Sequence, residues 1–77
     1  MTTVSISLNS IEKVKSFVNE IAAFENDFDL ISGRYLIDAK SIMGIFSLDL
    51  SQPIALNIHA DESELPVILE SLKPYIA

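Results

Sequence analysis

The sequence contains no cysteine and no tryptophan, only two glycines and three prolines, and five basic residues against eleven acidic ones. Without cysteine, the chain forms no disulfide, has no thiol nucleophile and offers no thiolate to a metal ion. The net charge of -6 at pH 7 disfavours binding to nucleic acid or to an anionic membrane surface. No run of about 18 apolar residues is present, so no membrane-spanning helix is expected.

The rest of the composition is typical of one globular domain. Apolar residues make up 49% of the chain and charged residues 21%, which favours a folded protein over a disordered tail. No linker, internal repeat or low-complexity stretch divides the chain, so we expect a single domain over residues 1–77. The opening residues MTTVSISLNS lack the basic and apolar parts of a secretory signal. We therefore expect the protein to be cytoplasmic.

The hydrophobic period changes several times along the chain. Apolar residues that alternate with polar ones predict four strands, at about residues 4–8, 28–31, 35–39 and 54–59. Apolar residues three and four positions apart predict three helices, at about residues 11–23, 42–48 and 65–72. Asn9, with Glu12 three positions later, is placed to cap the first helix. Asp61 or Ser63 is placed to cap the last one, and the Ser32-Gly33 pair marks a hairpin turn.

These elements predict an α+β fold. Helices with a single apolar stripe would cover one face of a four-stranded antiparallel sheet, in the order β-α-β-β-α-β-α, and leave the other face open. The pattern alone also allows a small ferredoxin-like ligand-binding domain, which the strand order would distinguish.

The segment AKSIMGIFSL, residues 39–48, points to one family. Its Lys-Ser-Ile-Met-Gly run resembles the regulatory-site segment of HPr, the histidine-containing phosphocarrier of the bacterial sugar phosphotransferase system. In addition, VSIS is similar to the first strand of that family, SFVNEIAAF to the end of its first helix and DESELPVILESL to its last helix. The resemblance implies the HPr-like open-faced sandwich, with three helices on one face of the sheet.

The phosphocarrier motif of that family, Gly-Leu-His-Ala-Arg-Pro-Ala, is missing. The resemblance puts Ser10 in the place of the histidine, Glu12 in the place of the arginine that holds the phosphate, and Lys13 in the place of the proline. A carrier needs a labile phosphoramidate on an imidazole, whereas a serine phosphoester is a stable storage form. We therefore expect that phosphocarrier activity has been lost.

The alternative, a working phosphocarrier, would need another histidine. His59 is the only one, and the strand alternation places it on the uncovered face of the sheet, opposite Ile58 and with no basic residue nearby in the sequence. We interpret His59 as an ordinary solvent-facing residue.

Ser41 is the better candidate for a functional site. It is placed to cap the following helix, a role that needs no further function. In the HPr family the matching serine is modified by a dedicated kinase/phosphorylase, so the resemblance implies regulatory phosphorylation of Ser41. A phosphate there would meet the free amides and the positive dipole end of the helix.

The helix after Ser41 is too short to bury all of its apolar residues. The family uses the residues that match Ile42 and Met43 as a docking surface, so we expect partial exposure and a docking surface made by Lys40, Ile42, Met43 and Phe46. The alternative is that this methionine and aromatic stripe belongs to the core.

Two groups of acidic residues, at residues 25–29 and 61–64, flank a strand start and a helix start, and we interpret them as solvated. No catalytic triad, metal site or phosphate loop is recognisable, so no enzymatic activity, cofactor or metal ion is expected. The sequence predicts an HPr-like, non-catalytic regulatory or interaction protein related to the phosphotransferase system. Its expected partners are proteins, such as a serine kinase/phosphorylase or a regulator.

Overall fold

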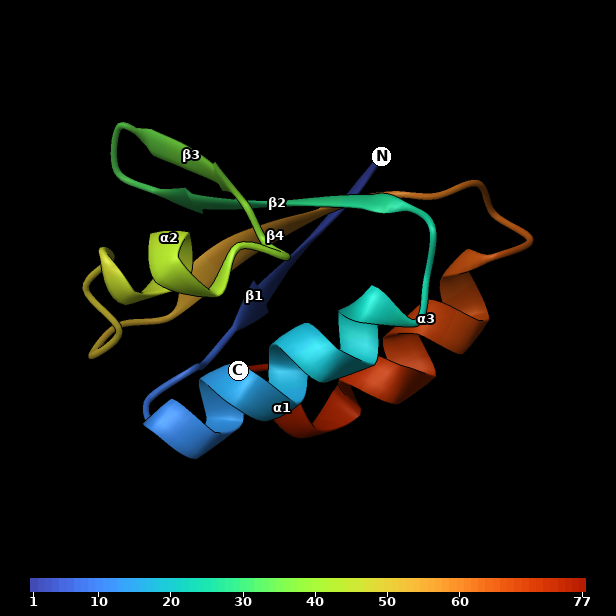
Figure 1. Cartoon of the computed structure of the whole chain (residues 1–77). Helices are drawn as coiled ribbons and strands as arrows, with labels where there is room; N and C mark the ends of the chain where they lie inside the picture. The colour runs from blue at the N-terminus through green and yellow to red at the C-terminus, as the bar shows by residue number, and fades with distance from the viewer.

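The computed structural model describes residues 1–77 and shows a four-stranded antiparallel sheet with helices on one side (Figure 1). The strands are β1 (Thr2–Ile6), β2 (Asp27–Ser32), β3 (Tyr35–Asp38) and β4 (Ile54–His59). The helices are α1 (Ile11–Ala22), α2 (Ile42–Phe46) and α3 (Leu65–Leu72), and the 3₁₀ turn η1 (Lys73–Tyr75) follows α3. The predicted α+β fold and the β-α-β-β-α-β-α order are confirmed. None of these helices combines the length and the hydropathy that a bilayer span requires.

The strand order is β1-β4-β2-β3, with every neighbouring pair antiparallel. β4 lies inside the sheet between β1 and β2, although it is the last strand in the sequence. A ferredoxin-like sheet would place β1 in the interior, whereas here β1 is at an edge with β4 as its neighbouring strand. The ferredoxin-like alternative is therefore wrong.

One hydrophobic core lies between the sheet and the helices. Alternate residues of the strands point into it, including Leu30, Leu56 and Ile58, and all three are fully buried. Phe17 of α1 and Ile68 of α3 close the core from the helical side. Fully burying each of these side chains contributes about 1.5–3 kcal/mol, so this layer supplies most of the stability of the fold.

The start of α1 differs by one residue from the sequence prediction. The N-cap is Ser10 and not Asn9: Ser10 is extended, and its Oγ accepts a hydrogen bond from the Lys13 amide at 3.1 Å. Asn9 and Ser10 are both good capping residues, so local preference does not choose between them. The cap lies where the chain leaves the buried Leu8 and starts a helix whose Val14 packs in the core.

The start of α3 also differs from the prediction. Glu64 precedes the helix without a side-chain capping bond, and neither Asp61 nor Ser63 caps the helix itself. Asp61 stabilises the preceding turn instead, because its carboxylate accepts hydrogen bonds from the Ser63 hydroxyl at 2.7 Å and from the Glu64 amide at 3.2 Å. These hydrogen bonds, that from Ser63 foremost, hold the pKa of Asp61 below its usual value of 3.8.

The residues after α3 extend the edge of the sheet, which the sequence analysis did not predict. The Ser7 amide donates to the Tyr75 carbonyl at 2.7 Å, and the Ala77 amide donates to the Ser5 carbonyl at 2.9 Å. Tyr75 is 5% exposed, and its ring packs edge-on against Phe17, with 5.6 Å between the ring centroids. The chain after α3 is therefore fixed both to β1 and to the core.

Candidate functional site

Ser41 is the N-cap of α2, as predicted from the sequence. Its backbone is extended, its Oγ accepts a hydrogen bond from the Gly44 amide at 3.2 Å, and its carbonyl accepts one from the Ile45 amide at 3.0 Å. The residue is exposed. The serine hydroxyl is therefore both oriented by the helix start and accessible from solvent.

Gly44 lets the first turn of α2 lie close to that hydroxyl. A Cβ atom at this position would be 3.1 Å from Ser41 Oγ and 3.4 Å from the side chain of Ile37. The distance to Ser41 Oγ is shorter than most Cβ contacts, whereas the distance to Ile37 is close to an ordinary van der Waals contact, so a larger residue would push against the capping oxygen. The Ser-x-x-Gly spacing thus serves the geometry of the cap.

The apolar side chains of α2 divide between core and solvent. Ile45 is fully buried and anchors the helix, and Ile42 is partly buried against the core. Met43 is 78% exposed and Phe46 is 40% exposed. The prediction that Ile42 and Met43 are partly exposed is confirmed, and the alternative of a fully buried stripe is wrong. The docking role of this surface stays a prediction.

Lys40 has an interaction that the sequence did not reveal. Its Nζ donates a hydrogen bond to the Phe24 carbonyl at 2.7 Å and lies 5.6 Å from the centroid of the Phe28 ring. The ammonium group therefore connects the chain before α2 to the segment that follows α1. A role of Lys40 in partner docking also stays a prediction, and it would compete with these contacts.

The residues that the resemblance matches to the family's phosphocarrier motif lie at the start of α1. Ser10 is exposed, its Oγ accepts a hydrogen bond from the Lys13 amide just as Ser41 Oγ accepts one from the Gly44 amide, and Glu12 puts a negative charge in the first helical turn. Ile11, beside them, is 63% exposed. This helix start has a hydroxyl and a carboxylate where phosphotransfer needs an imidazole and a cation.

His59 is far from that helix start in the fold. It lies at the end of β4 and points to the uncovered face of the sheet, as predicted. Its Nε2 is 2.6 Å from Asp29 Oδ2, with 42% of the His59 side chain and 25% of the Asp29 side chain exposed. Sequence reasoning missed this pair, because Asp29 becomes a neighbour only through the pairing of β2 with β4.

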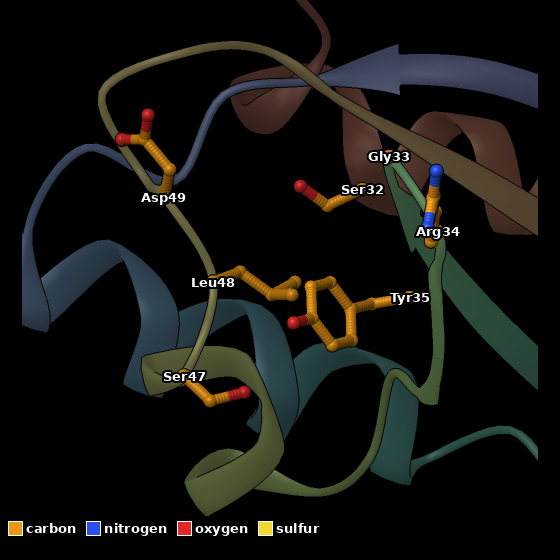
Figure 2. A pocket seen from close by; sticks show the side chains of 7 residues that line it. All are labelled: Ser32, Gly33, Arg34, Tyr35, Ser47, Leu48 and Asp49. Atoms are coloured by element: carbon orange, nitrogen blue, oxygen red, sulfur yellow. The ribbon is translucent and has the colours of Figure 1, made fainter.

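A shallow pocket of about 260 Å³ lies between the β2–β3 turn and the segment after α2 (Figure 2). The Tyr35 ring and the Leu48 side chain face each other across it, and Arg34 is on one side. Asp49 lies at its rim, where the Ser51 hydroxyl and amide hold the pKa of the carboxylate below its usual 3.8. The pocket contains no histidine and lies beyond the C-terminal end of α2, so it is separate from Ser41.

The comparisons with known proteins agree with this geometry. A family model described as the PTS HPr component phosphorylation site matches residues 12–77, so the match begins after Ser10. HPr-C-His from Thermoanaerobacter tengcongensis is 25% identical, with a TM-score of 0.77 over 96% of this chain and 89% of that chain. The phosphocarrier protein HPr from Bacillus anthracis is 26% identical, with a TM-score of 0.71 over 99% and 94% of the two chains.

A mycoplasma histidine-containing phosphocarrier protein shares the fold at 13% identity, with a TM-score of 0.70 over 95% of this chain and 86% of that chain. A search of curated protein sequences gave no match. The family model covers most of the residues, including Ser41 and α2. The chain therefore belongs to the HPr family of phosphocarrier proteins of the phosphotransferase system.

Proposed function

We propose that this protein is a cytoplasmic, non-catalytic regulatory member of the HPr family that no longer carries phosphoryl groups and is controlled by phosphorylation of Ser41. The observation that carries the proposal is the contrast between two helix starts. The resemblance to the HPr family matches Ser10, the N-cap of α1, to the histidine position, and it matches Ser41, the N-cap of α2, and the Ile-Met-Gly that follows it to the regulatory segment.

The chemistry at α1 supports the loss of phosphotransfer. A phosphoryl acceptor must be a good nucleophile near neutral pH and must lie beside groups that neutralise the incoming charge. The Ser10 hydroxyl makes no hydrogen bond to a histidine or a carboxylate that could act as a base, and its Oγ only accepts a hydrogen bond from the Lys13 amide. Glu12 would repel the phosphoryl group. His59 has a carboxylate beside it and not a cation.

The geometry at α2 supports regulation. The Ser41 hydroxyl is exposed, and the first amides of a helix have no partners within the helix and can bind a phosphate. A phosphate on Ser41 would put close to two negative charges beside Met43, which is 78% exposed. A partner that buries Met43 would then also have to accommodate those charges. Phosphorylation would therefore change which protein binds α2.

A kinase assay with mass spectrometry tests the regulatory part. With ATP and an HPr kinase/phosphorylase, the protein should gain one phosphate, the Ser10→Ala variant should gain the same phosphate, and the Ser41→Ala variant should gain none. An authentic HPr serves as the positive control. An unmodified mass under conditions that fully phosphorylate the control would contradict the regulatory role and leave Ser41 as a helix cap only.

A second assay tests the loss of phosphotransfer. After incubation with phosphoenolpyruvate and the first enzyme of the phosphotransferase system, the protein should carry no acid-labile, base-stable phosphate. A His59→Gln variant identifies the residue if a label does form. Label that is present on the native protein and absent from His59→Gln would support the phosphocarrier alternative.

A further inference from the structure

One whole face of the sheet is not covered by any helix (Figure 1). The strand register arranges its side chains in rows that run across the strands. One row consists of Ser5, Ala55, Ile31 and Leu36. The next row consists of Thr3, Asn57, Asp29 and Asp38, with Asp27 and His59 beyond it. We call these ten residues the open face.

The first row provides apolar surface. Leu36 is 64% exposed, and its register partner Ile31 and the adjacent Ala55 are only partly buried. Neighbouring side chains on one face of a sheet are close enough to act as one contact surface. Because these three residues come from β3, β2 and β4, the apolar surface spans three of the four strands.

The second part of the open face is acidic. Asp27, Asp29 and Asp38 all point to this side, and no lysine or arginine does. The basic residues lie on helices, loops or the hairpin turn: Lys13, Lys15, Lys40, Lys73 and Arg34. His59 already pairs with Asp29 at 2.6 Å. No lysine or arginine side chain pairs with the carboxylates of this face, although Asp38 Oδ1 accepts a hydrogen bond from the backbone amide of Lys40 at 2.9 Å.

Asn57, which lies in the second row between Thr3 and Asp29, has an unused hydrogen-bond donor. The residue is only 6% exposed, and its Oδ1 accepts a hydrogen bond from Thr3 Oγ1 at 2.7 Å. Its Nδ2 has no partner in the chain. Every fully buried side-chain nitrogen or oxygen of the protein has a hydrogen-bond partner. Because Nδ2 has none, it is accessible at the surface of the open face. A nearly buried amide that donates outward is suited to a carbonyl oxygen of another molecule.

We propose that the open face is a docking surface for an extended protein segment that presents a lysine or arginine two positions from an apolar residue. The rows lie about 7 Å apart along the strands, which is the spacing between residues i and i+2 of an extended peptide. The apolar residue would contact Leu36 and Ile31, the cation would pair with Asp29, and a backbone carbonyl would accept from Asn57.

Charge complementarity selects this occupant over others. A second copy of the chain would bring carboxylates against carboxylates, and nucleic acid or an anionic membrane would be repelled. A metal ion is not favoured either, because no three histidine, aspartate or glutamate side chains are grouped closely enough to hold one. The proposal does not depend on Ser41, since the open face and α2 present different residues.

Amide chemical shifts of the ¹⁵N-labelled protein test the proposal. The probe is an acetylated and amidated peptide, Thr-Leu-Thr-Lys-Thr-Lys-Thr. We expect saturable shifts centred on Asp29, Ile31, Leu36 and Asn57, with no comparable change in α2. The same peptide with glutamate in place of lysine should cause no shifts, and the peptide with threonine in place of leucine should bind more weakly.

Protein variants with a matched control complete the experiment. The double substitution Asp27→Asn with Asp29→Asn should weaken binding of the lysine peptide by about five- to tenfold, as expected for the loss of two exposed ion pairs. Leu36→Thr should weaken binding of the lysine peptide by a similar factor, and this loss should be the same at low and at high salt. The control, Glu12→Gln with Glu20→Gln, removes two charges from α1 and should change binding less than twofold. Absence of saturable shifts, shifts centred on α2, or equal weakening by the control would overturn the proposal.

Discussion

Replacing Ser41 with alanine tests the geometry on which the regulatory site depends. The substitution removes the oxygen that accepts the Gly44 amide at 3.2 Å, and because Ser41 is exposed it leaves no cavity in the core. The expected loss is therefore the capping contribution alone, about 1 kcal/mol. In a domain of this size, that loss lowers the melting temperature by roughly 4–8 °C. The Ser41→Asn variant keeps a capping oxygen and should melt close to the wild type.

The Ser41→Asp variant adds a charge to the same experiment. Its carboxylate caps the helix and also interacts with the positive end of the α2 dipole, which contributes about 0.3–1 kcal/mol at low salt. We expect it to melt at or above the wild-type temperature at low salt and to lose the excess at high salt. Thermal unfolding followed by circular dichroism measures all three variants.

The result that refutes this reasoning is an alanine variant that melts with the wild type while the asparagine variant does not. The hydroxyl would then carry no capping energy. The melting temperature also serves as a control for the kinase assay, because it shows whether the Ser41→Ala variant is folded. A loss near 1 kcal/mol is small beside the roughly 5–15 kcal/mol of a stable domain, so Ser41→Ala stays folded and its lack of phosphate reports on the site.

Substitutions at three further positions test the fold outside the proposed sites. Tyr75→Ala removes a 5% exposed ring that packs on Phe17 and should cost about 3–5 kcal/mol in urea unfolding, whereas Tyr75→Phe should cost about 1 kcal/mol; equal losses would contradict the core role of the ring. Gly33→Ala should cost about 1–2 kcal/mol, because residue 33 has φ of 60°, a conformation that alanine adopts only with strain. A Cβ there meets no atom within 4 Å, so the loss has no steric cause, and a smaller loss in the same assay would contradict the conformational one. The folded-state pKa of Asp61 lies below 3.8, so the stabilising effect of the ionised carboxylate is present above pH 3.8 and is lost as the pH falls through the folded pKa. The difference in urea stability between wild type and Asp61→Asn should therefore shrink as the pH falls below 3.8, and a constant difference would contradict the pKa assignment.

The sequence predicts the elements of this fold well, because most depend on local pattern. The alternation of apolar and polar residues predicts β4 with its bounds, and Ser41 is recognisable as a cap from its position before an apolar helix. The errors occur where two neighbouring residues are equally suitable, as with Asn9 and Ser10, or where a turn precedes a helix, as with Asp61. Local preferences are equal at such places, and the packing of the buried side chains decides.

The long-range contacts of the candidate sites could not be predicted in the same way. The pairing of Asp29 with His59 and the contact of Lys40 with the Phe24 carbonyl join residues that are distant in sequence. Both depend on which strands are neighbours, and no periodicity encodes that. The hydrogen bonds between the Tyr75 segment and the β1 segment could not be predicted from the sequence either, because the segment after α3 is too short to show a hydrophobic period. The exposure of Met43 was predictable because a helix of one turn and a half has little buried surface.

The position of β4 has a consequence for how the chain folds as it is made. β4 is the interior strand and the neighbour of both β1 and β2, yet it is the last strand to be synthesised. Until residues 54–59 leave the ribosome, β1 has no strand to pair with, and only the β2–β3 hairpin and the first two helices are able to form. Contacts between distant parts of a chain close slowly because a long loop must first be ordered. The nascent protein therefore exposes the apolar side of β1 and α1 for most of its synthesis, and a chaperone that binds there would act before the sheet closes.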